Sequence, residues 1–142
     1  MNVSKQITFI FSLILVACSQ SHIQTVSGEK VNFKDKTLVI NYWAEWCEPC
    51  IKEIPELNKL NALKAVEVVG INFDDLDAKT LKNIKEKMGI DFPLTQEKLN
   101  EKFHFDLPVA IPMTVIMTDE NSPVILMGPQ SYEDLVAKIK PI

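Results

Sequence analysis

The sequence predicts a single α/β domain: a small mixed sheet with a parallel strand–helix–strand half, an antiparallel hairpin half and helices on both faces. Two apolar runs, residues 37–43 and 66–73, flank a segment with helical periodicity, and such a unit favours a right-handed parallel crossover. Two more strand-like runs, residues 113–118 and 123–127, are separated by a short polar stretch and therefore predict a hairpin. A chain of 142 residues has room for one such domain.

The strands are predicted from their residue types. Residues 37–43 (TLVINYW) and 66–73 (VEVVGINF) are compact runs of β-branched, aliphatic and aromatic residues, which are typical of buried strands. Residues 29–36 are expected to hold a short edge strand that precedes them. The hairpin strands read MTVIMT and PVILM and enclose a turn at residues 119–122.

Apolar residues spaced three and four apart predict the helices. We expect them at residues 48–63, 78–88 and 99–103, and from Ser131 to near the C-terminus. Gly89 is the stop signal of the second helix, and Asp134 stands in capping-box position after Ser131.

Charge argues against nucleic acid as a partner. The formal net charge is −4, the cationic side chains are all Lys, and no basic patch stands out in the sequence.

The N-terminus is predicted to be a targeting segment. Lys5 precedes an apolar stretch at residues 7–17, which is shorter than the roughly 20 residues of a membrane-spanning helix and has the proportions of a signal peptide. The alternative is a buried N-terminal helix or strand. We expect residues 1–17 to be removed.

Residues 15–18 (LVAC) resemble the lipobox of bacterial lipoproteins. The resemblance implies that Cys18 is lipidated and becomes the mature N-terminus, so that the protein is anchored in the bacterial cell envelope and faces the periplasm. Residues 18–28 are polar and unpatterned, and we expect them to be a tether between the lipid and a domain at residues 29–142. The sequence does not choose between the inner and the outer membrane.

The segment Trp46-Cys47-Glu48-Pro49-Cys50 lies where the first buried strand gives way to a helix. Backbone N–H groups and the helix dipole favour an anion at a helix N-terminus, so a Cys there ionises readily. Pro49 is tolerated in the first turn. This placement predicts a redox pair formed by Cys47 and Cys50. Three alternatives remain: half of a zinc site completed by His22 and His104, an inert structural disulfide, or two ordinary buried thiols.

Residues 41–50 (NYWAEWCEPC) resemble the active-site segment of thioredoxins, and residues 50–55 (CIKEIP) narrow the resemblance to the extracytoplasmic TlpA/ResA-like branch. The similarity runs from about Val31 to the C-terminus. It implies a thioredoxin-like fold and the reduction of disulfides in exported proteins, apocytochromes c among them. Cys47 would attack and Cys50 would resolve, with no cofactor beyond this pair. By family analogy, a membrane thiol-electron transporter would restore the reduced state.

Two departures from cytoplasmic thioredoxins concern proton transfer and redox tuning. Asn41 stands where thioredoxins carry a buried Asp that accepts a proton, and Asn cannot do so at neutral pH. The branch resembles enzymes with a Glu three residues after the second Cys, which here is Glu53, on the helix face of Cys50; the alternative is a solvated Glu. Glu48 replaces a Gly and, as an anion, disfavours the Cys47 thiolate, which makes the disulfide less oxidising.

Ile111-Pro112 matches the place where thioredoxin-fold proteins hold a cis-proline beside the Cys pair. The resemblance therefore implies that Ile111, Pro112 and the flanking Trp46 contact the substrate. Pro108 is the competing proline, but no strand follows it directly. The segment 105–111 is longer than the usual connection, which affects the shape of the substrate groove.

Two other functions remain as alternatives. A peroxiredoxin-type peroxidase needs a Thr about three residues before the reactive Cys, and this chain has Ala44 there. A metal- or haem-delivery module could bind its cargo through the Cys pair.

Overall fold

The computed structural model describes residues 21–118 and 122–139. The predicted signal peptide, the lipidation site Cys18 and the tip of the predicted hairpin turn lie outside the described residues. Within these ranges no helix has the length and apolar character needed to cross a membrane.

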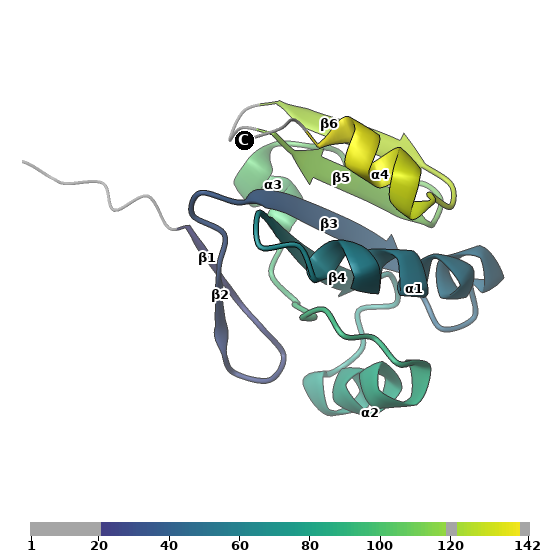
Figure 1. Cartoon of the computed structure of the whole chain (residues 1–142). Coiled ribbons are helices and arrows are strands. Elements are labelled where there is room, and N and C mark those ends of the chain that lie inside the picture. The colour runs from purple at the N-terminus through teal and green to yellow at the C-terminus, as the bar shows by residue number, and fades with distance from the viewer. Residues whose placement is uncertain (1–20, 119–121, 140–142) are drawn as a thin grey trace, which may run out of the picture.

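The predicted fold class is confirmed by a four-stranded mixed sheet (Figure 1). Its strands lie in the order β4 (Val66–Asn72), β3 (Thr37–Trp43), β5 (Met113–Met117) and β6 (Pro123–Met127). β3 and β4 are parallel, whereas β3–β5 and β5–β6 are antiparallel. β3 is an inner strand with all seven residues buried, which explains its uninterrupted apolar sequence.

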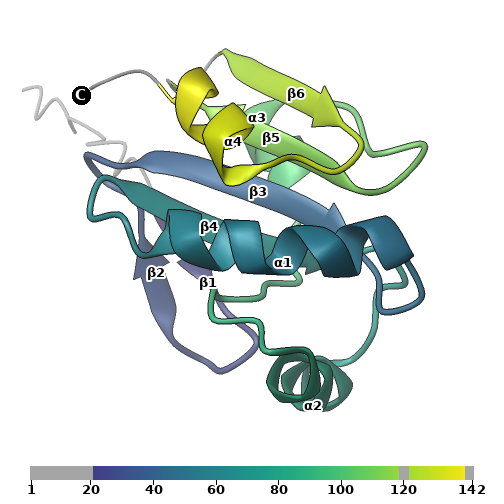
Figure 2. The same ribbon diagram turned by 45° about the vertical axis from the view of Figure 1, so that its right-hand side comes forward.

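Helices cover both faces of the sheet. Figure 2 shows α1 (Glu48–Asn61) and α4 (Tyr132–Lys138) in front of it, while α3 (Leu99–Phe103) lies behind and α2 (Ala78–Met88) lies beyond the β4 edge. The alternation of β3 builds two cores: Val39 and Trp43 pack with α1, α2 and α4, and Leu38 and Ile40 pack with α3. The expected helix stops and caps are present: Gly89 is left-handed, and the Ser131 hydroxyl caps α4 by accepting from Asp134 N–H while it donates to the Asp134 carboxylate.

The folded domain begins earlier than the predicted boundary at residue 29. β1 (His22–Gln24) pairs antiparallel with β2 (Lys30–Asn32), which is the short strand expected within residues 29–36. The expectation that residues 18–28 form a tether is therefore wrong from His22 onward. Ile23 is fully buried against the α3-side core, although the sequence around it is mostly polar.

Gly70 in the middle of β4 allows a close approach of the chain that follows α2. Gly70 N–H donates to the Pro93 carbonyl at 2.9 Å, and Thr95 N–H donates to the Gly70 carbonyl at 3.0 Å. A Cβ on Gly70 would lie 2.6 Å from Leu94 Cδ2 and 3.0 Å from Trp43 Nε1. Only glycine leaves room for this contact.

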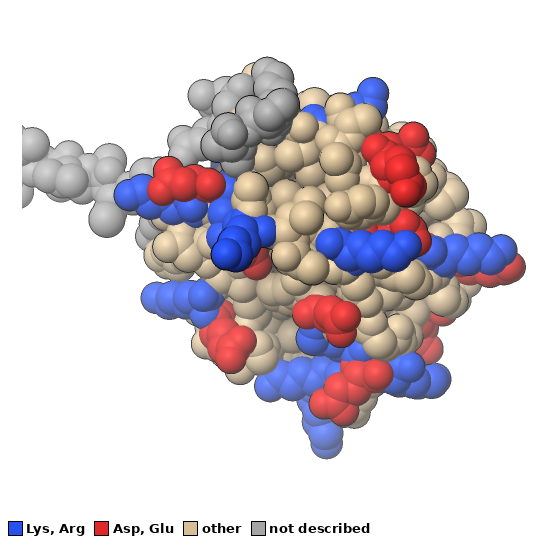
Figure 3. Space-filling model, viewed as in Figure 1, with Lys and Arg blue, Asp and Glu red and all other residues tan. Residues whose placement is uncertain are grey.

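The charged side chains are distributed without a single-sign field on the face shown in Figure 3. Lys side chains and Asp or Glu side chains are interspersed over this face, in keeping with the small net charge of −4. This distribution gives no support to a nucleic-acid partner.

Candidate active site

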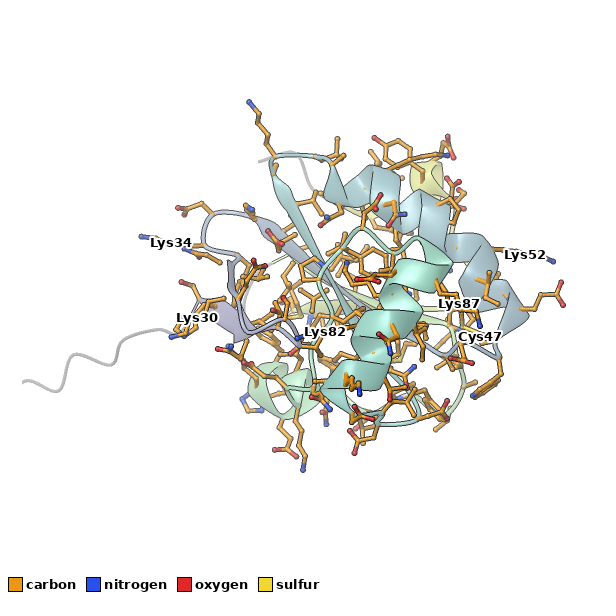
Figure 4. All side chains as sticks on the ribbon, turned by 90° about the horizontal axis from the view of Figure 1, so that it is seen from below. Lys30, Lys34, Cys47, Lys52, Lys82 and Lys87 are labelled. Atoms are coloured by element: carbon orange, nitrogen blue, oxygen red, sulfur yellow. A yellow bond between two sulfur atoms is a disulfide. The ribbon has the colours of Figure 1, made fainter. Side chains whose placement is uncertain are left out.

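Cys47 is the N-cap residue of α1 and is disulfide-bonded to Cys50, with the two Cα atoms 5.2 Å apart. Its Sγ accepts a hydrogen bond from the backbone N–H of Cys50 at 3.3 Å. Pro49 lies in the first turn, where its missing N–H removes no helical hydrogen bond. Figure 4 shows Cys47 at one side of the domain, with Lys52 further along the same helix. The N-terminus of α1 therefore points its backbone donors at the sulfur that would carry negative charge.

In the reduced protein we expect Cys47 to be alkylated before Cys50. Cys47 caps the helix and is 5% exposed, whereas Cys50 lies inside the first turn and is 1% exposed. Limited iodoacetamide labelling between about pH 5 and 9, followed by peptide mapping, measures the order. Urea-unfolded reduced protein is the control in which both thiols react alike. Earlier labelling of Cys50 in the folded protein would show that the roles are reversed.

Trp46 flanks the pair and is held in place by residues after β4. The indole is 62% exposed, and its Nε1–H donates to Asp74 Oδ2 at 2.7 Å. The ring also packs edge-on against Phe73, with centroids 6.4 Å apart. The sequence showed Trp46 beside the Cys pair but gave no signal that Asp74 would orient it.

Glu48, between the two cysteines, has its side chain in solvent and forms an i,i+4 ion pair with Lys52 at 2.7 Å. The hydrogen bond and the charge of Lys52 lower the pKa of Glu48. The Lys52 ammonium offsets part of the repulsion that the Glu48 carboxylate exerts on a Cys47 thiolate. The expected effect of Glu48 on the redox pair is therefore weakened by its neighbour.

Glu53 is 1% exposed and lies on the buried face of α1 together with Cys50, so the alternative of a solvated Glu is wrong. Its Oε2 accepts from Asn41 Nδ2 at 3.0 Å. Its Oε1 accepts from the backbone N–H of Gln130 at 3.0 Å and, more weakly, from the Thr114 hydroxyl at 3.4 Å. The carboxyl group therefore joins α1, β3, β5 and the loop before α4.

Burial raises the pKa of Glu53 from its usual 4.5 to about 7, although the hydrogen bonds from Gln130, Asn41 and Thr114 pull it down. A carboxyl group with a pKa near neutrality is suited to accept and return a proton under physiological conditions. Asn41 takes part as a hydrogen-bond donor, and its Nδ2 also donates to Thr114 Oγ1 at 3.0 Å. Thr114 and Gln130 were not predicted as members of this group.

The Ile111–Pro112 peptide bond is cis, as the resemblance implied. Pro112 immediately precedes β5, whose first residues Met113 and Thr114 pair with Tyr42 and Asn41 of β3. The carbonyl of Pro112 accepts from Gly128 N–H at 2.9 Å. The proline is thereby joined to the same part of the sheet that carries the Glu53 partners.

The residues behind the alternative functions are also located. His22 lies on β1 and His104 follows α3. In the described part of the chain no three His, Cys, Asp or Glu side chains gather as a metal site would require. Position 44 is a fully buried Ala whose carbonyl accepts the Cys47 N–H at 3.2 Å. It has no hydroxyl to offer a peroxide.

The chain matches the family model described as "AhpC/TSA family" over residues 11–122. No curated protein is significantly similar to it in sequence. Among solved structures it is similar to a thiol:disulfide interchange protein of the thioredoxin family from Chlorobium tepidum TLS, at 27% identity and a TM-score of 0.64, covering 80% of this chain and 86% of that one.

Two other solved structures have the same fold at lower identity. StoA from Bacillus subtilis is 19% identical with a TM-score of 0.62, covering 80% of this chain and 91% of its own. The pneumococcal exposed lipoprotein thioredoxin Etrx1 from Streptococcus pneumoniae strain TIGR4 is 15% identical with a TM-score of 0.63, covering 83% and 96%. The fold around the Cys pair is thus thioredoxin-like.

Proposed function

Because this chain belongs to the AhpC/TSA family and carries a Cys pair at the start of a helix in a thioredoxin-like fold, we propose that it reduces disulfides in exported proteins through its Cys47–Cys50 pair. The observation that carries the proposal is the position of this pair at the N-terminus of α1, one turn before a buried carboxyl group, in a domain whose Ile111–Pro112 bond is cis. The pair itself carries the electrons, so the reaction needs no other cofactor.

The reaction proceeds in two thiol–disulfide exchanges. The Cys47 thiolate attacks one sulfur of the substrate disulfide, which forms a mixed disulfide and releases the other substrate sulfur as a thiolate. Cys50, after losing its proton, attacks the Cys47 sulfur. This step releases the second substrate thiolate and forms the Cys47–Cys50 disulfide, so two electrons have passed to the substrate.

Glu53 accepts the proton of Cys50 in the second exchange. A pKa of about 7 lets the carboxyl group alternate between its charged and neutral forms near neutral pH. Asn41 donates to the carboxylate and cannot itself take a proton, which leaves this task to Glu53. A membrane thiol-electron transporter then returns two electrons to the Cys pair.

Trapping tests this function. In Cys50→Ser the mixed disulfide cannot be resolved, so we expect the variant to retain exported cysteine-containing proteins, which reducing agents release and mass spectrometry identifies. Cys47→Ser/Cys50→Ser is the matched control and should retain none. Apocytochromes c among the captured proteins would extend the resemblance to substrate choice. Failure of the wild type to reduce insulin, together with empty traps, would contradict the proposal.

The purified wild-type protein also tests the peroxidase alternative. Because Ala44 supplies no hydroxyl group, we expect little turnover of hydrogen peroxide with dithiothreitol as the reductant. Peroxide turnover faster than insulin reduction would favour the alternative. Copper or haem bound stoichiometrically by the reduced protein, without insulin reduction, would favour a delivery module.

The location is proposed from the lipobox resemblance at Cys18. If Cys18 is lipidated in the cell envelope, we expect Cys18→Ala to leave the membrane fraction or to accumulate in an unprocessed form. Fractionation with immunoblotting and the mass of the N-terminal peptide measure both effects. Cys47→Ser is the control, since it also removes a Cys but should keep the anchor. Unchanged membrane partitioning and processing of Cys18→Ala would remove the lipoprotein proposal.

A further inference from the structure

A cavity of about 430 Å³ lies at the carboxyl end of the edge strand β4, between α2, α3 and the segment that leads to Pro112. Its wall is largely apolar and includes Phe73, Leu76, Leu107 and Pro108. The carboxyl ends of strands in α/β sheets are common ligand sites, and this volume lies within the range of pockets that hold small ligands or side chains.

Two polar side chains of the wall can donate to a ligand. Tyr42 is 3% exposed and lines the cavity. Burial raises the pKa of Tyr42 to about 12, so the hydroxyl keeps its proton and remains a donor. Asn72 is 7% exposed, and its Nδ2 has no partner although its Oδ1 accepts from Asp74 N–H. A buried donor without a partner, as Asn72 Nδ2 is, is costly, and a carbonyl group of a bound chain is suited to satisfy it.

The rim of the cavity is acidic. Asp75, Glu97 and Glu101 face one lysine, Lys98, which pairs with Glu101 at 3.4 Å. Asp75 has no ion-pair partner among the described residues, and Glu97 accepts a hydrogen bond from the uncharged backbone N–H of Gln24. The rim therefore carries uncompensated negative charge, which complements a cationic group on the ligand.

One residue of the cavity wall contacts the segment that carries the redox pair. Phe73 lines the cavity and contacts Trp46, the residue before Cys47. Leu107 lines it from the other side and is exposed, as is Val109, on the way to Ile111 and Pro112. A polypeptide whose disulfide lies over Cys47 would pass along this apolar surface, and exposed apolar patches of this kind mark interaction sites.

We propose that this cavity binds the substrate polypeptide beside its cysteine, taking one large apolar side chain inside while a neighbouring Lys or Arg meets the acidic rim. The inference rests on the proposed reductase function, because the bound polypeptide is a substrate only if the protein reduces disulfides. Binding of the polypeptide in the cavity can nevertheless be measured without catalysis. The backbone carbonyl groups of the bound segment accept from Tyr42 and Asn72. The proposed substrates are therefore exported proteins in which a cysteine lies close to a large apolar residue and a Lys or Arg.

The binding step is tested without redox chemistry. Two synthetic peptides of equal length are used, in both of which Ser replaces the substrate cysteine. Next to this position, one peptide has Leu followed by Lys, and the control peptide has Ser followed by Glu. In NMR titrations of the full chain we expect the Leu–Lys peptide to shift the side-chain amide signals of Asn72 and Gln96. The Ser–Glu peptide should leave them in place. Equal shifts, or none, would overturn the proposal.

The kinetic test uses the same two peptides with their cysteines in disulfides, together with a small neutral disulfide. We expect wild-type KM to be about tenfold lower or more for the Leu–Lys peptide, as burial of one Leu side chain allows. Leu107→Ser and Asp75→Asn/Glu101→Gln should each remove most of this difference at unchanged rate on the small disulfide. Glu86→Gln/Glu133→Gln is the matched control, because it removes the same charge from exposed positions outside the cavity wall.

The outcomes separate the two proposals. Similar wild-type KM values for both peptides, with the small disulfide still reduced, would overturn the cavity proposal and leave the reductase function intact. No reduction of any disulfide, with the amide shifts of Asn72 still specific for the Leu–Lys peptide, would overturn the reductase function and leave the binding site.

Discussion

Glu53→Gln is expected to slow disulfide reduction about 100-fold or more, while the Cys pair still oxidises and reduces. Proton transfer by a positioned side chain typically contributes about 10²–10⁴-fold. Gln keeps the size and the helix propensity of Glu, and its carbonyl oxygen can accept one of the bonds from Asn41 or Gln130. We therefore expect the fold to be retained. Stopped-flow reduction of a model disulfide between about pH 6 and 9 measures the loss.

The pH dependence of the reduction rate distinguishes a Glu53 that accepts a proton from one with only a structural role. Cys50 resolution in the wild type should accelerate as Glu53 loses its proton near pH 7, and this inflection should be absent from Glu53→Gln. Glu86→Gln is the matched control, since it makes the same exchange at an exposed helix position. Wild-type rates for Glu53→Gln across this range would show that the two cysteines and water suffice.

The same substitution should stabilise the protein above neutral pH. Between pH 4.5 and about 7 the folded state keeps the Glu53 proton that the unfolded chain releases, so the free energy of unfolding falls as pH rises through this window. The raised pKa corresponds to a loss on the order of 3 kcal/mol. Urea titrations should show that Glu53→Gln escapes this loss and that wild type and variant differ least at pH 4.

Gly70→Ala is expected to lower the free energy of unfolding by about 1–3 kcal/mol. The new Cβ would lie 2.6 Å from Leu94 Cδ2, 2.9 Å from Phe92 Cε2 and 3.0 Å from Trp43 Nε1, all of them on buried side chains. Gly to Ala otherwise stabilises by about 0.4–1 kcal/mol through the unfolded chain. The clash should outweigh this gain, because the three neighbours have little space into which to move.

Thermal and urea unfolding measure this loss. Leu94→Val removes Cδ2, the atom nearest to the new methyl group, so Gly70→Ala/Leu94→Val should be less destabilised than the sum of the single variants. A Gly70→Ala protein at least as stable as wild type would show that the contact between β4 and the segment after α2 can relax.

The sequence predicted the parts of the fold that have strong local patterns. β3 has the predicted bounds because an inner strand buried on both faces reads as a continuous apolar run, and α2 has them because Gly89 ends a clear apolar stripe. β1 was missed because three residues with one buried side chain, Ile23, show no period. Its strand pairing depends on β2 and on the core beneath, which local sequence does not reveal.

The residues of the site also differ in whether the sequence could predict them. The Cys pair, cis-Pro112 and Glu53 were predicted because they belong to a short motif or match a family position. Thr114 and Gln130 were not, since each meets Glu53 across more than sixty residues of sequence. Gln130 takes part through its backbone N–H, which every residue except Pro carries, so its identity holds no signal.

If Cys18 is lipidated, as proposed, the place where β1 begins also limits how far the domain can stand from a membrane. From a lipidated Cys18 to His22 the chain can span at most about 14 Å, even fully extended. β1 is fixed to the domain by its pairing with β2 and by buried Ile23, so no further length can be released. The enzyme would therefore search a thin layer above the lipid headgroups in two dimensions. Disulfides and electron donors outside that layer would be beyond its reach.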